Sequence, residues 1–498
     1  MPKDAWKLID EHPLTPLDEL FAHVPDRLSR LAHDVSGIYF DWSKTHLDEA
    51  LLGLFVRLAD HSGFAAAREA LFSGEIVNPT EQRPAEHVAE RGSGAAEAVQ
   101  LASIRRSRTR ALVDAVEAGA FGDVSGILHI GIGGSVLGPA LVVDALGARR
   151  STLRVSFLSN IDPHALGEAI EPLDPATTLV VAVSKTFTTA ETQANLAAAM
   201  DWLRDGGIDD PYGRVIAVTA APEVAVEAGI DETRILQFSE GVGGRYSLWS
   251  PVSVSAALAL GWDRFEELLE GAAEMDRHFR YSEPATNVPL LAAFADLLYT
   301  QKLGSKTRAI FPYDERLRLL VPYLQQLEME SNGKSVTGDG RPVGRATAPV
   351  VWGGVGTDAQ HAVFQLLHQG TAVIPVEFVA VAEDHSALAD HHRQLLLNAF
   401  AQGAALMRGR SSDDPHRSYE GNRPSSTILL NRLDARTLGA LIAFYEHRTF
   451  ANAVLLGINP FDQFGVELGK EIARELSEGA DEESLDPSTR ALIERAAV

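Results

Sequence analysis

The sequence predicts an α/β protein with two doubly wound, mostly parallel sheets and with helical segments at both ends of the chain. Between about residues 121 and 475, short β-branched apolar runs alternate with longer segments of helical periodicity. This alternation is typical of parallel strands covered by helices. The chain of 498 residues is also too long for one ordinary hydrophobic core, so we expect two domains.

Residues 1–120 are expected to form a helical N-terminal segment. Apolar side chains recur at helical spacing in 17–24 and 51–58, and a polar stretch at 78–81 separates the two groups. This part of the sequence carries no pattern of chemical groups that indicates a site.

The first α/β domain is expected at 121–280 and the second at 281–475. Strand candidates of the first domain are 127–130, 153–158, 179–183 and 215–218; those of the second are 309–311, 350–352 and 376–381. The helical run 262–277 is the expected connection. Residues 476–498 are predicted to be a C-terminal helical tail.

Composition excludes several classes of function. The formal net charge is −24 and no basic run occurs, so nucleic acid is not an expected partner. No apolar run is long enough to span a membrane, and the N-terminus lacks the apolar core of a secretory signal. The chain has no cysteine, which excludes disulfides and thiolate chemistry and suits a cytoplasmic protein.

A turn rich in hydroxyl groups follows the apolar run 179–183. Its polar residues are five hydroxyl side chains and one lysine: Ser184, Lys185, Thr186, Thr188, Thr189 and Thr192. At a strand-to-helix turn, such groups and the first backbone N–H groups of the helix can converge on a phosphate or carboxylate. Capping of the helix is the alternative, but capping needs one hydroxyl residue rather than five.

A glycine-rich turn follows the strand candidate 127–130. Gly131, Gly133, Gly134 and Ser135 would allow a close backbone approach to a ligand. The turn does not match a dinucleotide fingerprint, because Val136 stands where that pattern has glycine, and no Walker lysine follows. Beside the hydroxyl turn, at the carboxyl edge of one parallel sheet, it indicates a phosphate site.

Two carboxylates, Glu328 and Glu330, lie among apolar and amide residues just before Gly333 and Lys334. Partial desolvation would suit one of them to act as a general base near neutral pH. The alternative is a helix end with surface glutamates, closed by Gly333 and by the charge of Lys334. The sequence leaves both interpretations open.

Two further candidates are cationic. Arg245 follows flexible glycines and could stabilise a developing oxyanion, although it could equally bond a neighbouring loop. His361 and His368 share a helix face, but a zinc helix has its histidines four residues apart, and no third ligand accompanies this pair. We therefore expect no metal site.

Six short motifs, taken in order, closely resemble the phosphoglucose isomerase (glucose-6-phosphate isomerase) family. They are Gly131-Ile-Gly-Gly-Ser135, Ser184-Lys-Thr-Phe-Thr-Thr189, Gly243-Gly-Arg245-Tyr-Ser, Met329-Glu330-Ser-Asn-Gly-Lys334, Gln360-His361 and Phe461-Asp-Gln463-Phe-Gly-Val-Glu-Leu-Gly-Lys470. The resemblance spans about residues 125–475. Residues 1–120 match no motif of the family, and Phe464 stands where many members have tryptophan.

The resemblance implies two sugar isomerase (SIS) domains, and an enzyme of glycolysis and gluconeogenesis that interconverts glucose 6-phosphate and fructose 6-phosphate. It implies a homodimer with shared active sites, no cofactor and no metal. The residues expected to bind the phosphosugar are Gly134, Ser135, Ser184, Lys185 through its backbone, Thr186, Thr189, Gln326 and Gln463. Glu330 would be the base, Arg245 would stabilise the enediolate, and His361 from the neighbouring subunit would open the ring with Lys470.

Two rival functions remain possible from the sequence. A phosphosugar-binding regulator on the same fold would keep the hydroxyl turn but would not need Glu330, Arg245, His361 and Lys470 together. An isomerase of another sugar phosphate, such as mannose 6-phosphate, would use the same groups.

Overall fold

The computed structural model describes residues 2–147, 153–384, 388–477 and 485–496. The chain forms two compact units, Met1–Pro460 and Phe461–Val498. Both sheets belong to the larger unit. The division into segments that end at residues 120, 280 and 475 therefore stays a prediction about the organisation of the sequence, and part of the predicted tail lies outside the described residues.

The first sheet has five strands, all parallel, in the order β4-β3-β5-β6-β7. Its strands are β3 (Gly126–Ile130), β4 (Arg154–Leu158), β5 (Thr178–Val183), β6 (Val215–Thr219) and β7 (Ile235–Gln237). The four strands expected in this domain are confirmed. β7 was not predicted, because three residues are too few to show a periodic pattern.

The central strand β5 is buried at all six positions, which explains why its sequence is a continuous apolar run. Alternate residues face opposite sides of the sheet. Val180 and Ala182 pack with Leu196 and Met200 of helix α9 (Ala190–Asp205) in one hydrophobic cluster. This face of the strand is thereby fixed against α9, and so is the turn that joins them.

The second sheet has six strands in the order β1-β2-β11-β10-β8-β9. They are β1 (Ala32–Val35), β2 (Ile38–Asp41), β8 (Thr307–Tyr313), β9 (Val350–Gly353), β10 (Val376–Val381) and β11 (Ser425–Leu430). β8, β9, β10 and β11 pair in parallel, whereas β1 and β2 form an antiparallel extension at the edge. The three strands expected in this domain, which correspond to β8, β9 and β10, are confirmed, whereas β11 was not predicted.

The N-terminal segment is not only helical, which corrects the prediction for residues 1–120. β1 and β2 form a hairpin whose turn residues Ser36 and Gly37 have positive φ, as a two-residue hairpin turn requires. Phe40 of β2 packs against Phe444 with ring centroids 4.6 Å apart. The hairpin is stabilised by pairing with β11 and by this distant ring, and four-residue strands leave little trace in the local sequence.

Helices cover both sheets. The N-terminal segment forms α1 (Pro2–Glu11), α2 (Leu17–His23), α3 (Arg27–Leu31), α4 (Glu49–His61), α5 (Phe64–Ser73) and α6 (Ala96–Glu117). The region of the first sheet adds α7 (Gly134–Leu146), α8 (Pro163–Ile170), α9, α10 (Pro222–Glu227) and α11 (Val254–Leu260). The region of the second adds α13 (Val288–Leu297), α14 (Leu320–Leu324), α15 (Asp358–Gln369) and α16 (Ala389–Arg408). The smaller unit contains α18 (Glu467–Ser477) and α19 (Pro487–Ala496).

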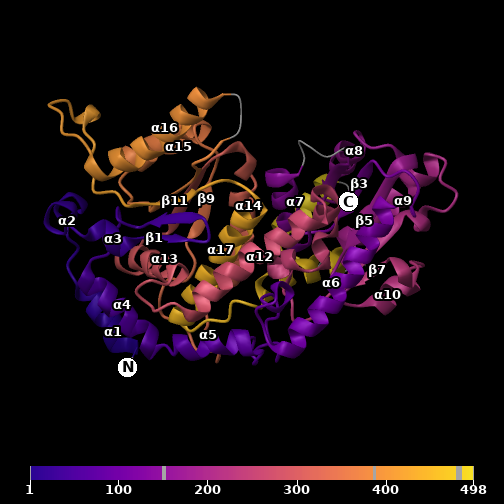
Figure 1. The fold of residues 1–498 in the computed structure, drawn as a ribbon, viewed down its shortest axis with the longest axis horizontal. Helices are drawn as coiled ribbons and strands as arrows, with labels where there is room; N and C mark the ends of the chain where they lie inside the picture. The colour runs from indigo at the N-terminus through magenta and orange to yellow at the C-terminus, as the bar shows by residue number, and fades with distance from the viewer. Residues whose placement is uncertain (1, 148–152, 385–387, 478–484, 497–498) are drawn as a thin grey trace. The chain divides into compact units, whose positions relative to one another are not determined.

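Two long helices, α12 (Trp262–Tyr281) and α17 (Ala435–Leu456), pack along each other and lie between the sheets (Figure 1). A β-carbon added at Gly271 would lie 1.9 Å from the carbonyl oxygen of Arg436, and one at Gly439 would lie 2.0 Å from that of Leu268. Glycine at both positions therefore lets the two backbones touch. α12 contains the predicted connection 262–277.

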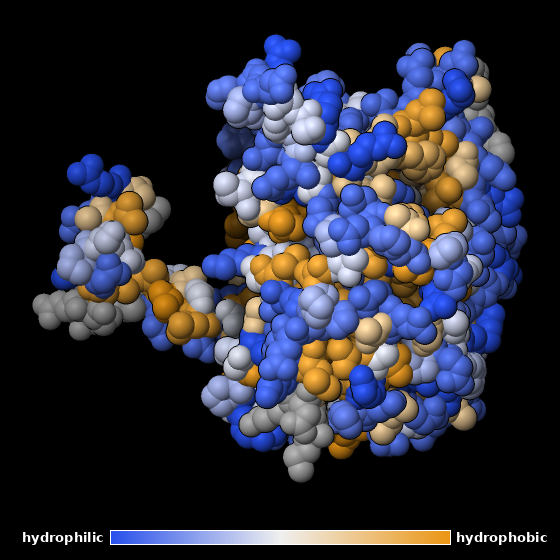
Figure 2. Space-filling model, turned by 90° about the vertical axis from the view of Figure 1, so that its left-hand side faces the viewer, coloured by the Kyte–Doolittle hydropathy of each residue, from blue (hydrophilic) through white to orange (hydrophobic). Residues whose placement is uncertain are grey.

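No helix in the described part of the chain is long and apolar enough to cross a membrane. On the face that Figure 2 shows, hydrophilic residues predominate and hydrophobic residues form patches among them.

Candidate active site

The hydroxyl turn lies between β5 and α9. The Ser184 N–H donates to the Val218 carbonyl at 3.1 Å, which holds the turn at the sheet edge. Ser184 Oγ and Thr189 Oγ1 are 2.9 Å apart, and Thr186 Oγ1 and Thr188 Oγ1 are 2.8 Å apart. Thr189 occupies the N-cap position of α9, yet its side chain makes no capping hydrogen bond. The hydroxyls therefore bond one another instead of capping the helix, which favours the anion-binding interpretation.

The side chain of Lys185 is directed at a neighbouring loop. Its Nζ donates to the carbonyls of Glu240 at 2.7 Å and Val242 at 3.2 Å. Burial, with Arg83 close by, lowers the pKa of this ammonium to about 8. Phe187 has φ of +56° and is buried, so packing of its ring holds a strained backbone. The turn therefore presents the backbone of Lys185, while the ammonium anchors the loop.

The glycine turn lies between β3 and α7. Because β3 and β5 are parallel neighbours, this turn and the hydroxyl turn share the carboxyl edge of the sheet. Gly133 has φ of +56°, which glycine adopts without strain. A β-carbon at Gly134 would lie 2.1 Å from the backbone carbon and oxygen of Gly244. Only glycine allows α7 to begin this close to residues 241–249, the loop that contains Arg245 (the arginine loop).

His129, a residue that the sequence analysis did not single out, holds the glycine turn by a hydrogen bond to its last residue. Its Nε2 lies 2.7 Å from the Ser135 carbonyl and its Nδ1 2.8 Å from Ser255 Oγ. Since a carbonyl only accepts, Nε2 carries the proton. Burial lowers the pKa of His129 to about 4, so the ring is neutral near pH 7. In the sequence, its position inside an apolar strand was the one feature that could have pointed to this role.

Arg245 belongs to the 3₁₀ helix η5 (Gly244–Trp249) and is buried. Its Nε donates to Ser331 Oγ at 2.7 Å and its Nη2 to the Pro460 carbonyl at 2.6 Å. Its Nη1 lies 3.4 Å from Glu330 Oε2. The guanidinium is thus held by Ser331 and by the Pro460 carbonyl, and it lies beside the Glu330 carboxylate. Ser331, which also lies 3.0 Å from the hydroxyl of Tyr246, is a second contributor that the sequence did not indicate.

Glu328 and Glu330 lie on the π-helical segment η9 (Gln325–Glu330). Single π turns occur frequently at functional sites. Glu328 is directed into the protein interior, where its Oε1 accepts from Arg448 Nη2 at 2.6 Å and its Oε2 from Arg308. The Glu330 side chain keeps 20% of its surface exposed. Glu330 is therefore partly open to solvent, whereas Glu328 is bound in the interior.

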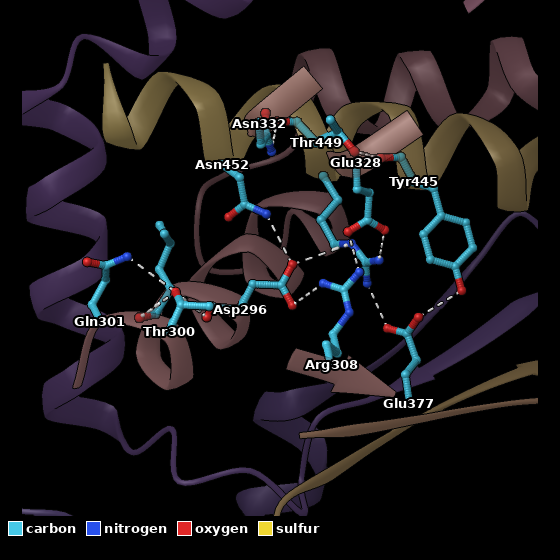
Figure 3. Close-up of polar contacts among 12 residues, drawn as sticks. Asp296, Thr300, Gln301, Arg308, Glu328, Asn332, Glu377, Tyr445, Thr449 and Asn452 are labelled. Atoms are coloured by element: carbon cyan, nitrogen blue, oxygen red, sulfur yellow. Dashed lines mark hydrogen bonds and ion pairs between the residues drawn. The ribbon is translucent and has the colours of Figure 1, made fainter. Parts of the chain in front are cut away.

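Figure 3 shows the network that contains Glu328. Arg448 Nη1 donates to Glu377 Oε2 at 2.7 Å, and Arg308 Nη1 lies 2.6 Å from Asp296 Oδ1. Burial opposes the charge of Arg448, but the surrounding carboxylates raise its pKa well above the ordinary value. The network joins β8, β10, α13 and α17 to η9, and so fixes the segment that carries Glu330.

The two turns, the arginine loop and η9 meet within the larger unit. A β-carbon at Gly133 would lie 2.7 Å from Gln326 Nε2, so the predicted ligand Gln326 touches the glycine turn. Lys334 Nζ donates to the carbonyls of Glu330 and Ser331, both at 2.8 Å. Lys334 therefore closes the end of the helix, as the sequence suggested, and Glu330 nevertheless remains partly exposed.

The remaining candidates lie elsewhere in the chain. His361 is exposed on α15 of the larger unit, whereas His368 of the same helix bonds Gln402 at 3.0 Å. Gln463 and Lys470 belong to the smaller unit. Among the residues that the structure describes, no group of three or more His, Cys, Asp or Glu side chains could hold a metal ion.

Two adjacent turns rich in glycine and hydroxyl residues, and a carboxylate beside a buried arginine, are the features expected of a phosphosugar isomerase built on parallel sheets. Comparison with known proteins identifies the family. A model of the phosphoglucose isomerase family matches residues 41–493. The chain belongs to this family, whose members interconvert glucose 6-phosphate and fructose 6-phosphate.

Individual relatives match over nearly the whole chain. The glucose-6-phosphate isomerase of Rhizorhabdus wittichii is 63% identical over 99% of both chains, and that of Zymomonas mobilis is 54% identical over 98% of this chain and 97% of the relative. A crystal structure of the Chlamydia trachomatis enzyme has a TM-score of 0.90 at 31% identity and covers 99% of this chain and 98% of that one. The likeness therefore extends into residues 1–120, where no motif had revealed it.

Proposed function

We propose that this protein interconverts glucose 6-phosphate and fructose 6-phosphate by opening the sugar ring and moving a proton between C2 and C1 through a cis-enediolate. The observation that carries the proposal is the pairing of Glu330 with Arg245 at 3.4 Å. A carboxylate that is partly open to solvent and faces a fixed cation is the arrangement that proton transfer next to a carbonyl requires.

The phosphate would be held by the hydroxyl and glycine turns. The groups assigned to it are the side chains of Ser135, Ser184, Thr186 and Thr189 and the backbones of Gly134 and Lys185. The two turns open the helices α7 and α9, whose N-terminal N–H groups favour an anion. Because the phosphate is remote from the reacting carbons, its binding energy would position the sugar for proton transfer.

At the other end of the sugar, Glu330 would remove the proton from C2 and return it to C1. A proton on carbon beside a carbonyl is weakly acidic, so the negative charge that develops on oxygen needs a nearby donor. Arg245 would supply it. Its bonds to Ser331 and to the Pro460 carbonyl hold the guanidinium ready before the charge appears.

Ring opening is assigned to His361 and Lys470, and orientation of the sugar to Gln326 and Gln463. His361 is exposed on α15, which suits a residue that serves the active site of a second subunit. The proposal therefore includes a homodimer with shared sites. A location in the cytoplasm is proposed separately, from the lack of cysteine in the sequence. Mixing an inactive Glu330→Gln chain with an inactive His361→Gln chain should restore activity in the hybrid dimer; no restoration would place His361 in its own chain's site.

The proposed reaction is tested by a coupled assay of glucose 6-phosphate and fructose 6-phosphate interconversion, run with excess chelator. We expect full activity. No turnover would indicate a binding protein, and loss of turnover only with chelator would indicate a metal. Faster turnover of mannose 6-phosphate than of glucose 6-phosphate would show that the preferred substrate is mannose 6-phosphate.

A further inference from the structure

A cavity lies at the amino edge of the five-stranded sheet, the edge opposite the hydroxyl and glycine turns. Its volume is about 600 Å³, and three arginines but only one acidic residue, Asp210, line it: Arg108, Arg214 and Arg234. Leu112 and Phe121 supply apolar lining. The volume is in the range of small-molecule sites, which is about 300–1,000 Å³.

The strand order separates this cavity from the hydroxyl and glycine turns. Arg214 ends the 3₁₀ helix η3 (Pro211–Arg214) directly before β6, and Arg234 ends η4 (Glu232–Arg234) directly before β7. Since β6 and β7 are parallel neighbours, both arginines lie at the amino edge of the sheet. The turns assigned to the phosphosugar lie at the carboxyl edge.

Two of the three arginines, Arg214 and Arg108, are held in place by backbone carbonyls. Arg214 donates from Nη1 to the Phe121 carbonyl at 3.0 Å and from Nη2 to that of Ala176 at 2.8 Å. Arg108 of α6 donates to the carbonyl of Glu232. These bonds orient the guanidinium groups without neutralising their charge.

Within the described ranges, none of the three arginines has an acidic oxygen within 4.0 Å. The aspartates closest in sequence are occupied by backbone: Asp210 accepts from the Gly213 N–H at 3.2 Å, and Asp231 accepts from the Thr233 N–H at 2.9 Å. Arg234 also keeps a buried Nε that no described residue bonds. A buried donor without a partner is costly, so the cavity offers unsatisfied positive charge in a chain of net charge −24.

We propose that this cavity binds a small phosphorylated anion. Its phosphate would lie among the three guanidinium groups, since the guanidinium fork matches phosphate geometry in a bidentate manner. Its carbon body would lie against Leu112 and Phe121. The inference is independent of the proposed isomerase reaction, because no residue of the cavity belongs to that site.

Hydrogen exchange followed by mass spectrometry tests the proposal on the full chain, with inorganic pyrophosphate as the probe and sodium chloride of equal ionic strength as the reference. We expect pyrophosphate to slow exchange in peptides that cover 108–121, 210–214 and 231–235. The hydroxyl turn 184–189 reports separately on the phosphosugar site. Protection at 184–189 without protection of the three cavity peptides would overturn the proposal, and so would no protection in either place.

Two variants make the test specific. The variants are Arg234→Gln and Arg108→Gln, the latter on the exposed face of α6. Each should raise the pyrophosphate concentration needed for half-maximal protection of the cavity peptides by at least about tenfold. This increase corresponds to the loss of one charge-assisted contact. Arg204→Gln is the matched control: it removes the same charge from an exposed pair on α9 and should change nothing. All three variants should keep the wild-type kcat. Equal half-protection in all four proteins would refute binding through these arginines.

Discussion

Replacing Glu328 and Glu330 separately by glutamine should give opposite phenotypes, although the two residues lie two positions apart on η9. Glu328 accepts hydrogen bonds from two buried arginines, Arg308 and Arg448 (Figure 3). An amide nitrogen cannot accept, so Glu328→Gln removes the negative charge and one acceptor from the two arginines, which then share Asp296 and Glu377. Breaking a buried pair in this way costs about 3–5 kcal/mol.

That loss converts into a measurable shift of the melting temperature. An unfolding entropy of about 2.1 cal/mol/K per residue amounts to about 1 kcal/mol/K for a chain of this length, so Glu328→Gln should lower Tm by about 3–5 °C. Glu330 is partly exposed and has one cationic partner at 3.4 Å. Its replacement should lower stability less than that of Glu328, because the pair is partly open to solvent and Arg245 keeps its bonds to Ser331 and to the Pro460 carbonyl.

Turnover should show the reverse order. Loss of a general base lowers kcat by about 10²–10⁴-fold, so we expect this of Glu330→Gln, together with loss of solvent deuterium exchange into fructose 6-phosphate. Glu328→Gln should keep most of its kcat at a temperature where it is folded. The reasoning is refuted if Glu330→Gln melts several degrees early, if it still exchanges deuterium at the wild-type rate, or if Glu328→Gln loses turnover while its Tm is unchanged.

Three further outcomes are expected. Gly134→Ala should abolish activity and lower Tm, because its β-carbon would lie 2.1 Å from backbone atoms of Gly244. The control Gly167→Ala places its β-carbon in open space within α8 and should stabilise the protein by about 0.5–1 kcal/mol. Equal Tm values for the two variants would contradict the close approach at Gly134. Thr186→Ala should raise KM about tenfold or more through loss of a charge-assisted bond to the phosphate. Lys185→Gln keeps the backbone N–H and should raise KM less. The opposite ranking in steady-state assays would assign phosphate binding to the Lys185 ammonium. The folded pKa of His129 is about 4, below the unfolded value of about 6.5, so its stabilising effect is complete above pH 6.5 and is lost as the pH falls to 4. Urea unfolding should therefore show the stability difference between wild type and His129→Gln shrinking by about 3 kcal/mol over that interval, and a constant difference would exclude the titration.

Much of the fold was predictable because its signals are local. Strand β5 is buried on both faces, so its sequence is an uninterrupted apolar run, and the glycine and hydroxyl residues that follow β3 and β5 are confined to a few positions. The hairpin β1–β2 was missed for the converse reason. Its strands are stable through β11 and a phenylalanine about 400 residues further along the chain, and a four-residue window does not contain that information.

The sequence by itself determined the class of the fold, the order of the two turns at one sheet edge and the resemblance to the family, since each depends on neighbouring residues. Its local pattern could not choose between Glu328 and Glu330, because both lie in the same helical run, and only the resemblance to the family pointed to Glu330. Tertiary structure made the choice: Arg448, 120 residues away, binds Glu328 in the interior, whereas Arg245 approaches Glu330 from another loop. Burial and charge pairing decide which carboxylate can react, and both depend on segments that only the folded chain brings together.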